Sequence, residues 1–454
     1  MARKYFIETF GCQMNFHDAE RVSGLLEQDG YEPTDDERAA DLVVINTCSV
    51  RERAAEKVYS RLGEIRELTR DEQPAGPEHS RRVVAVMGCV AQQEGDRMLR
   101  RDSSIDVVVG TQRLKELPRL VDAAIRTRRR VVDINPHEDV SFPLGVTRHA
   151  DPVRARVTII EGCNEFCAFC VVPYTRGHER MRPVADILDE VREAARTGHR
   201  EVQLLGQIVN HYQAPDDPAC DFAALLERVN AIDGIDRIRF ASPHPRHVTD
   251  RLIQAIRGLP TVCKHLHLPV QSGSNRVLQS MRRRHTREDY FALVDRLRAA
   301  VPGIAISTDM IVGFPGETAE DFELTLDLVR RVRYHSMFSF KYSPRPNTLA
   351  LKRMPDDVPE VEKTKRIVAL QRLQAEIQFE WHEQAVGRVF EVLVDASSRR
   401  RGHELAGRTS GNTVVNFPGL PEWLNTLQPV LITAAAPNSL RGEVVGAAAG
   451  VLAG

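Results

Sequence analysis

Apolar strand-like runs that alternate with helix-like runs constrain the fold of this chain more than any other feature of its sequence. Between these runs apolar residues recur at spacings of three and four, as in Val184, Ile187 and Val191, which is typical of helices that cover a sheet. Within residues 153–385 there are six strand-like runs, at 157–160, 202–205, 238–241, 265–270, 304–311 and 337–342. Because six βα units suit an open barrel better than a closed eightfold one, we predict a (β/α)6 partial barrel.

The flanking regions predict two further domains. Residues 1–130 contain near-continuous apolar runs between helix-like segments, and strands of this kind are buried on both faces, so we predict a doubly wound parallel-sheet α/β domain. Residues 131–152 have three prolines and no clear period, which predicts a linker. The partial barrel ends in a long connector helix predicted at 358–385. Short alternating runs with Gly and Pro over 386–454 predict a small antiparallel β-barrel.

Composition is that of an ordinary globular protein. Hydrophobic residues make up 42% and charged residues 28% of the 454 positions. The first residues lack the apolar stretch of a signal peptide, and no uninterrupted run of 18 apolar residues occurs, so we expect a cytoplasmic protein without a membrane span. A net charge of -1 gives no global attraction to nucleic acid, which leaves any such binding to local basic patches.

Three of the eight cysteines, Cys163, Cys167 and Cys170, are named here the loop triad. They have the spacing CxxxCxxC directly after the first strand of the predicted barrel, at the face where barrel enzymes carry their active sites. Three thiolates on one loop can each bind one iron of a cubane cluster and leave the fourth iron open. A zinc site would need a fourth ligand at comparable spacing, commonly from a CxxC or HxxxH pair, and none follows. Zinc and plain core cysteines are the alternatives.

A second set, Cys12, Cys48 and Cys89, is named the strand-end triad because each cysteine directly follows a predicted strand of the first domain. Ligands of open parallel sheets collect at the carboxyl ends of the strands, so residues far apart in sequence can converge there. We interpret the set as a second tridentate site, with buried structural cysteines as the alternative. Cys220 and Cys263 have no such setting and are interpreted as structural.

These motifs resemble a known family. CxxxCxxC after a barrel strand is similar to the signature of radical S-adenosylmethionine enzymes, and two cysteine triads before a small barrel resemble the methylthiotransferases along essentially the whole chain. Relatives that act on threonylcarbamoyl-adenosine in tRNA or on a ribosomal protein tend to differ after the first cysteine, where this chain has Gln13, Met14 and Asn15. The segments GCQMN, NTCSVRERAAEKV, CVVPYTRG, LLGQ, HLPVQSGSNRVL, MIVGFPGET and YSPRP look like the branch that modifies isopentenyladenosine next to the tRNA anticodon. The other two branches are the alternative.

The resemblance implies two 4Fe-4S clusters, one on each triad, and S-adenosylmethionine as both radical source and methyl donor. The cluster of the loop triad would generate a 5'-deoxyadenosyl radical, and the cluster of the strand-end triad would hold the sulfur until its transfer to C2 of the adenine. The first domain must then dock over the mouth of the barrel. The resemblance also implies tRNA as partner, an electron donor such as flavodoxin or ferredoxin, and a monomer. It does not indicate the sulfur donor.

Three further residues, Gln207, Ser307 and Asp309, are candidate contacts of S-adenosylmethionine. Gln207 ends the second barrel strand, where the family often contacts the amino group of this cofactor, although a strand-end residue can also satisfy its own loop. Asp309 interrupts an apolar run, so a buried carboxylate there requires a partner or a ligand. The nearby GFPGET lacks the lysine of a P-loop and predicts a turn into a helix.

The carboxy-terminal barrel resembles the TRAM-like RNA-binding domain of tRNA-modifying enzymes. Its run Arg399, Arg400 and Arg401 is a candidate phosphate contact, whereas such runs are otherwise solvated turns. A competing function for the whole chain is an iron-sulfur protein that transfers electrons or senses oxidation. Such a protein would not cleave S-adenosylmethionine when reduced.

Overall fold

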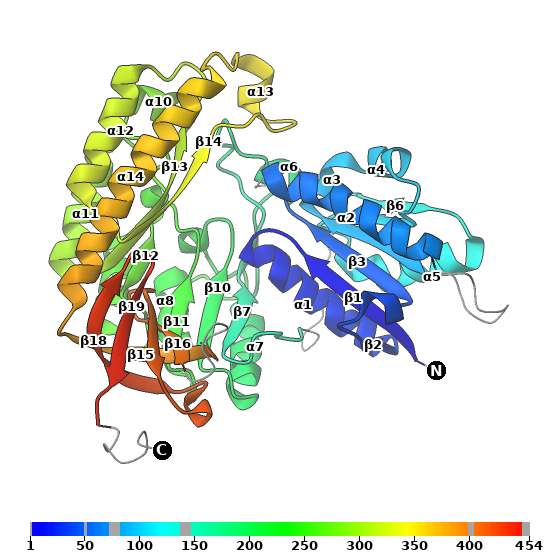
Figure 1. Ribbon diagram of the computed structural model, residues 1–454, viewed down its shortest axis with the longest axis horizontal. Coiled ribbons are helices and arrows are strands. Elements are labelled where there is room, and N and C mark those ends of the chain that lie inside the picture. The colour runs from blue at the N-terminus through cyan, green and yellow to red at the C-terminus, as the bar shows by residue number, and fades with distance from the viewer. Residues whose placement is uncertain (1, 50–51, 72–81, 137–146, 398–403, 447–454) are drawn as a thin grey trace.

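The computed structural model describes residues 2–49, 52–71, 82–136, 147–397 and 404–446. Figure 1 shows an N-terminal α/β domain on one side of a larger partial barrel and a small β-barrel at the base of that partial barrel. The hydrophobic cores of the three parts are separate clusters of buried side chains. Among the described residues no helix has the length and apolar character needed to cross a membrane.

The N-terminal domain has one six-stranded sheet in which every pairing is parallel, in the order β2-β1-β3-β4-β5-β6. The strands are β1 (Arg3–Thr9), β2 (Tyr31–Pro33), β3 (Leu42–Thr47), β4 (Val83–Gly88), β5 (Val107–Val109) and β6 (Val131–Asp133). β3, β4 and β5 are buried along their whole length, as continuous apolar runs require. The predicted doubly wound parallel sheet is confirmed.

Helices cover both faces of this sheet. α1 (Gln13–Gln28) and α5 (Leu117–Thr127) pack on one face through Val22 and Leu120. α2 (Glu52–Asp71), α3 (Cys89–Glu94) and α4 (Asp96–Arg101) lie on the other, with Leu62 and Met98 in the core. Two strands differ from expectation, because β2 was not predicted and β6 lies where a linker was expected. Both have only three residues and carry too short a pattern to stand out.

The second part contains six parallel strands in two three-stranded sheets, ordered β11-β10-β7 and β12-β13-β14. A bridge between Ile238 and Val262 links them. The strands are β7 (Arg154–Thr158), β10 (Glu201–Leu205), β11 (Arg237–Phe240), β12 (His265–His267), β13 (Ala305–Val312) and β14 (Ser336–Lys341). α7 (Val184–Arg196), α8 (Phe222–Asn230), α9 (Asp250–Gly258), α11 (Arg287–Ala300) and α12 (Ala319–Val332) surround them, and α14 (Glu360–Ala385) follows. The predicted open partial barrel is confirmed.

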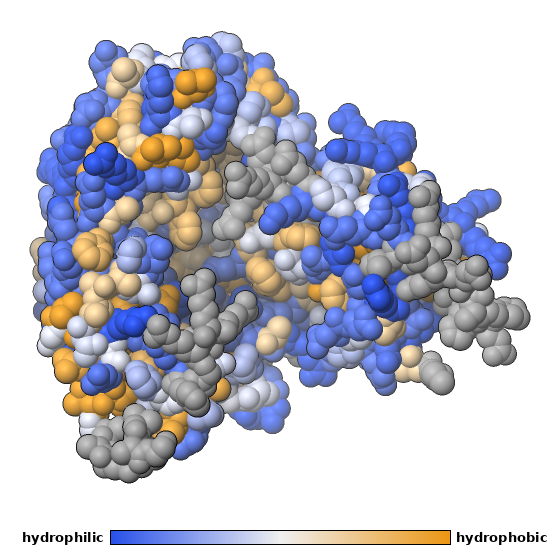
Figure 2. Space-filling view, viewed as in Figure 1, coloured by the Kyte–Doolittle hydropathy of each residue, from blue (hydrophilic) through white to orange (hydrophobic). Residues whose placement is uncertain are grey.

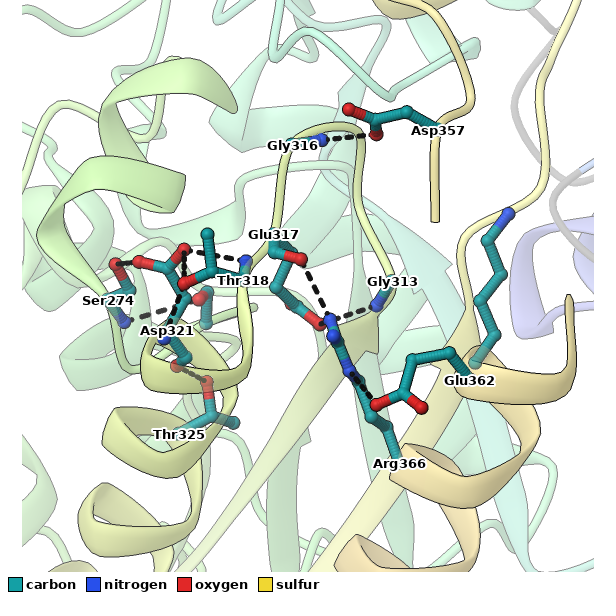
Figure 3. Close-up of polar contacts among 12 residues, drawn as sticks. Ser274, Gly313, Gly316, Glu317, Thr318, Asp321, Thr325, Asp357, Glu362 and Arg366 are labelled. Atoms are coloured by element: carbon teal, nitrogen blue, oxygen red, sulfur yellow. Dashed lines mark hydrogen bonds and ion pairs between the residues drawn. The ribbon is translucent and has the colours of Figure 1, made fainter. Parts of the chain in front are cut away.

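The GFPGET segment is a turn that leads into α12, as predicted. Thr318 caps the helix, and Thr318 and Asp321 form a reciprocal capping box. Figure 3 shows how neighbouring elements hold this turn: Asp321 accepts a hydrogen bond from Ser274, and Glu317 receives one from the backbone of Gly313 and another from Arg366 of α14. The carboxyl end of β13 is therefore tied to the connector helix.

The small barrel is closed, in the order β15-β16-β17-β19-β18. Its strands are β15 (Val389–Ser397), β16 (Glu404–Thr409), β17 (Val414–Pro418), β18 (Leu427–Ala436) and β19 (Ser439–Val444). The predicted small antiparallel barrel is confirmed, and one of its pairings, β17–β19, is parallel. Arg239 of β11 donates to the carbonyl oxygens of Thr409 and Ser410, which places the small barrel at the amino ends of the partial-barrel strands.

Candidate functional site

The strand-end triad lies at the carboxyl ends of β1, β3 and β4. Cys12 caps the start of α1, Cys48 follows β3, and Cys89 begins α3. The strand order turns back between β1 and β3, which is where open α/β sheets form a crevice for ligands. The side chains of Cys12 and Cys48 form a hydrogen bond, and the charge of Cys12 acts on Cys89. The fold thus brings these three cysteines together.

The protonation of this triad is shaped by its surroundings. The hydrogen bond with Cys48 and the positive charge of Arg176 lower the pKa of Cys12 to about 6, although burial opposes the shift. Burial raises the pKa of Cys89, and Arg176 opposes that rise. Thiolates are the form that binds iron, so a nearby cation favours the ligand state of the triad.

The loop triad lies between two short strands, β8 (Ile160–Glu161) and β9 (Arg180–Met181), which pair as a hairpin at the mouth of the barrel. Backbone hydrogen bonds fix the loop: Cys170 donates to the carbonyl oxygen of Cys167 at 3.0 Å, and Ala168 donates to Met281 at 2.9 Å. The three cysteines act on one another electrostatically. Burial raises the pKa of Cys163 to about 11 and that of Cys170 to about 12.

The two triads fit iron-sulfur cubanes better than single ions. In the described part of the chain, no three His, Cys, Asp or Glu side chains are grouped so that they could hold one metal ion. A zinc site requires its ligands around one centre, whereas a cubane offers separate irons to separate thiolates. Arg283 donates to Cys167 Sγ at 3.5 Å, and hydrogen bonds to cluster sulfurs are a known means of tuning such groups.

Glycine precedes the first cysteine of each triad. Gly11 has φ +122°, and a Cβ at this position would lie 2.2 Å from Cys48 Cβ. Gly162 has φ +80°, and its Cβ would lie 2.1 Å from the carbonyl oxygen of His178. Both positions require glycine for backbone conformation and for close approach. The Gly-Cys pairs were visible in the sequence, but only the fold gives them this meaning.

The three candidate contacts of S-adenosylmethionine differ in the partners that they have in the structure. Gln207 follows β10, and its Oε1 is buried without a hydrogen-bond partner, as expected of a group that awaits a polar ligand. Asp309 already has a partner, because its carboxylate lies 3.3 Å from His267 Nε2. The hydroxyl of Ser307 lies between His267 Nδ1 at 2.9 Å and His265 Nε2 at 3.0 Å. Sequence reasoning missed these two histidines, because their partners lie on the neighbouring strand.

The inner wall of the partial barrel exposes aromatic rings beside this pair. On β14, Ser339 and Lys341 bond to α14, so the alternate residues Phe338 and Phe340 face inward. Phe338 is 55% exposed and Phe340 37%, and the ring of His267 lies edge-on to Phe338. Figure 2 shows apolar side chains where the surface is hollowed between the barrel and the N-terminal domain. Arg399, Arg400 and Arg401 lie outside the described residues.

A turn at residues 175–177 connects the loop triad to the N-terminal domain. Gly177 O accepts a hydrogen bond from Cys163 N at 3.2 Å. On the other side, Thr111 and Gln112 of the N-terminal domain donate to the carbonyl oxygens of Thr175 and Arg176, the second at 3.0 Å. The N-terminal domain is therefore docked on the segment that leaves the loop triad. The turn is part of the motif CVVPYTRG, whose sequence alone does not indicate this docking role.

Comparisons with known proteins agree with this arrangement. Residues 4–110 match Uncharacterized protein family UPF0004, residues 157–329 the Radical SAM superfamily, and residues 383–445 the TRAM domain. The chain is 44% identical over 449 residues to a tRNA-2-methylthio-N(6)-dimethylallyladenosine synthase of Carboxydothermus hydrogenoformans, covering 98% of this chain and 100% of that protein. It is 47% identical over 449 residues to a protein of the same name from Pseudomonas savastanoi pv. phaseolicola, with the same coverage.

A solved structure of similar fold is the radical S-adenosylmethionine methyltransferase TsrM from Kitasatospora setae with cobalamin and a 4Fe-4S cluster bound. The match has a TM-score of 0.56 at 15% identity and covers 86% of this chain and 77% of that one. At this low identity the likeness concerns the fold alone.

Proposed function

The chain belongs to the family of tRNA-2-methylthio-N(6)-dimethylallyladenosine synthases, and we propose that it adds a methylthio group to C2 of N6-isopentenyladenosine next to the anticodon of tRNA. The observation that carries the proposal is the presence of two cysteine triads on two domains that contact each other through one turn, residues 175–177. One triad alone would fit many radical enzymes. Two triads on two docked domains fit an enzyme that both activates a carbon and delivers sulfur to it.

The chain's residues divide these tasks. When bound, the cluster of the loop triad with S-adenosylmethionine supplies a 5'-deoxyadenosyl radical, and the cluster of the strand-end triad supplies the site for sulfur. Cys163, Cys167 and Cys170 would hold the first cluster, and Cys12, Cys48 and Cys89 the second. The unpartnered Oε1 of Gln207 supports its role as acceptor for the amino group of S-adenosylmethionine. Ser307 and Asp309 remain candidate contacts of S-adenosylmethionine on the inner wall of the barrel, where both contact His267.

The inner wall supports an apolar, base-like substrate. Adenine has a flat face, and its dimethylallyl group is a small branched hydrocarbon. The inward rings of Phe338 and Phe340 offer a surface for stacking and apolar contact. Exposed aromatic rings inside a barrel otherwise leave apolar surface in water at a cost. We therefore assign these rings to the isopentenyl-adenine base.

Several supporting roles complete the proposal. The TRAM domain, together with Arg399, Arg400 and Arg401, would bind the tRNA backbone. A small electron carrier such as flavodoxin or ferredoxin would supply the reducing electron to a monomeric enzyme. Because tRNA and reduced thiols are both cytoplasmic, we place the reaction in the cytoplasm.

The proposal is tested by nucleoside analysis of tRNA from cells that lack the gene. We expect loss of 2-methylthio-N6-isopentenyladenosine, accumulation of N6-isopentenyladenosine, and restoration by the wild-type gene. Loss of the methylthio form of threonylcarbamoyl-adenosine instead, or of a modified ribosomal protein side chain, would assign the chain to one of the sibling branches. Absence of 5'-deoxyadenosine after anaerobic reduction of the purified protein would favour the electron-transfer reading.

A further inference from the structure

Arg176 is a buried arginine that crosses from one domain to the other. It ends the short helix α6 (Val172–Thr175), six residues after Cys170, and only 6% of its surface is exposed. Its guanidinium leaves the partial barrel, named here the radical domain, and enters the N-terminal domain. There it lies 2.6 Å from Asp18 Oδ2 and 3.3 Å from Asn15 Oδ1. A buried arginine of this kind requires charged or polar partners, and the N-terminal domain supplies all of these side-chain partners.

The same guanidinium reaches the strand-end triad. Asn15 Oδ1, which accepts from Arg176, also accepts from Cys12 Sγ at 3.4 Å. Arg176 interacts directly with the side chain of Cys89 as well. Asn15 is itself fixed by hydrogen bonds from its amide to Thr47 O at 2.6 Å and Phe10 O at 3.1 Å. The positive charge is thus held at a defined place beside two of the three cysteines.

Asp18 sits on the other side of this charge. It pairs with Arg176, and both groups are almost fully buried, with side-chain exposures of 2% and 6%. Arg176 lowers the pKa of both Cys12 and Cys89, and Asp18 raises the pKa of both by a smaller amount. The triad therefore faces the positive end of a buried ion pair, in a region where charges are weakly screened.

We propose that Arg176, supplied by the radical domain, is the counter-charge that sets the reduction potential of the cluster on Cys12, Cys48 and Cys89. This inference rests on the proposed function, because it takes the strand-end triad to hold a cluster. Arg176 acts on the cluster through Asn15 and the cysteines, and it is therefore a positioning residue. It makes the electronic state of the sulfur-carrying site depend on the docking of the two domains.

The sign of the effect follows from electrostatics. Reduction adds one electron from an external reductant to the cluster and breaks no bond. A neighbouring positive charge stabilises the added electron and raises the potential, and a neighbouring carboxylate lowers it. Removal of the Arg176 charge should therefore lower the potential, and removal of the Asp18 charge should raise it. A loss of packing alone would not produce shifts of opposite sign.

The test uses the reconstituted full-length protein with the loop triad replaced by alanine, so that one cluster contributes to the signal. EPR-monitored redox titration with dithionite would compare the parent with Arg176→Gln, Arg176→Lys and Asp18→Asn. Arg156→Gln is the matched control, because Arg156 of β7 crosses the same domain boundary to Glu20 of α1 at 2.7 Å. Iron and sulfide content would be measured for each variant.

We expect a lower midpoint potential in Arg176→Gln, a higher one in Asp18→Asn, a smaller shift in Arg176→Lys, and no shift in Arg156→Gln. Equal potentials in all variants, or shifts of the same sign for Arg176→Gln and Asp18→Asn, would overturn the inference. If Arg176→Gln fails to retain iron, the Asp18→Asn and Arg176→Lys results decide alone. A parent protein that binds no iron would instead show that the strand-end triad holds no cluster, and it would contradict the proposed function as well.

Discussion

The two cysteine triads are built in opposite ways. The loop triad comes from eight consecutive residues, and its shape depends on a short hairpin and a few backbone hydrogen bonds. The strand-end triad follows three strands, its cysteines are up to 77 residues apart in sequence, and its shape depends on the whole parallel sheet. The first can be recognised from spacing alone. The second becomes a site only when the domain folds, and its charge environment is completed by Arg176 of another domain.

The largest expected effect is the loss of the loop triad. Cys163→Ala should abolish 5'-deoxyadenosine formation and methylthio transfer together, because no other described thiolate can replace its iron ligand. Chromatography of the reduced reaction with S-adenosylmethionine measures the first product. Cys220→Ala is the matched control, because Cys220 is a buried cysteine of the barrel's hydrophobic core and belongs to neither triad, and it should retain both activities. Cleavage that persists in Cys163→Ala would contradict the assignment.

The strand-end triad should give a narrower loss. Cys48→Ala is expected to keep S-adenosylmethionine cleavage and to lose methylthio transfer, because only the sulfur site is damaged. Mass spectrometry of the tRNA nucleosides, run beside the cleavage assay, separates the two outcomes. Methylthio transfer that survives in Cys48→Ala would contradict the assignment of the strand-end triad as the sulfur site.

Substitution of the glycine that precedes each triad should impair iron binding at that triad alone. Gly11→Ala and Gly162→Ala each force a Cβ into a neighbour at a positive φ, with a cost of about 1–3 kcal/mol for the strained backbone alone. We expect each variant to lose iron from its own triad only. Gly30→Ala and Gly198→Ala are matched controls, because both have positive φ and open space around the added Cβ. Equal iron loss in the controls would show that backbone strain alone causes the loss, without a contribution from the contacts of the added Cβ.

The smallest effect is expected on the inner wall. Phe338→Ala should reduce the efficiency of methylthio transfer about tenfold, equivalent to about 1.4 kcal/mol, through a raised KM for tRNA. Cleavage of S-adenosylmethionine should stay unchanged, which separates a base contact from a cofactor contact. Phe379→Ala is the control, since Phe379 of α14 is 37% exposed and lies outside the barrel wall. A parallel loss of cleavage would assign Phe338 to the cofactor instead.

The sequence was informative where the pattern was long or local. Continuous apolar runs predicted β3, β4 and the barrel strands, and the order of βα units predicted the open barrel. Three-residue strands such as β2 and β6 carry too little periodicity to be seen. The parallel β17–β19 pairing was missed because strand direction within a small barrel depends on the path of the connecting loops.

The candidate site shows the same limit. Cysteine spacing and strand ends pointed to both triads before the fold was known. Arg176, Asp18 and His267 could not be assigned, because each gains its role from a residue on another element. Asp309 was expected to need a partner on grounds of burial, and the identity of that partner came only from the register of β12 with β13.

The most direct test of two separate cluster sites is a count of iron and acid-labile sulfide in anaerobically reconstituted protein. Wild type should contain about eight irons per chain, and alanine replacement of either complete triad should leave about four. The variant without the strand-end triad should still produce 5'-deoxyadenosine, whereas the variant without the loop triad should not. About four irons in the wild type, or about eight in either variant, would contradict the account.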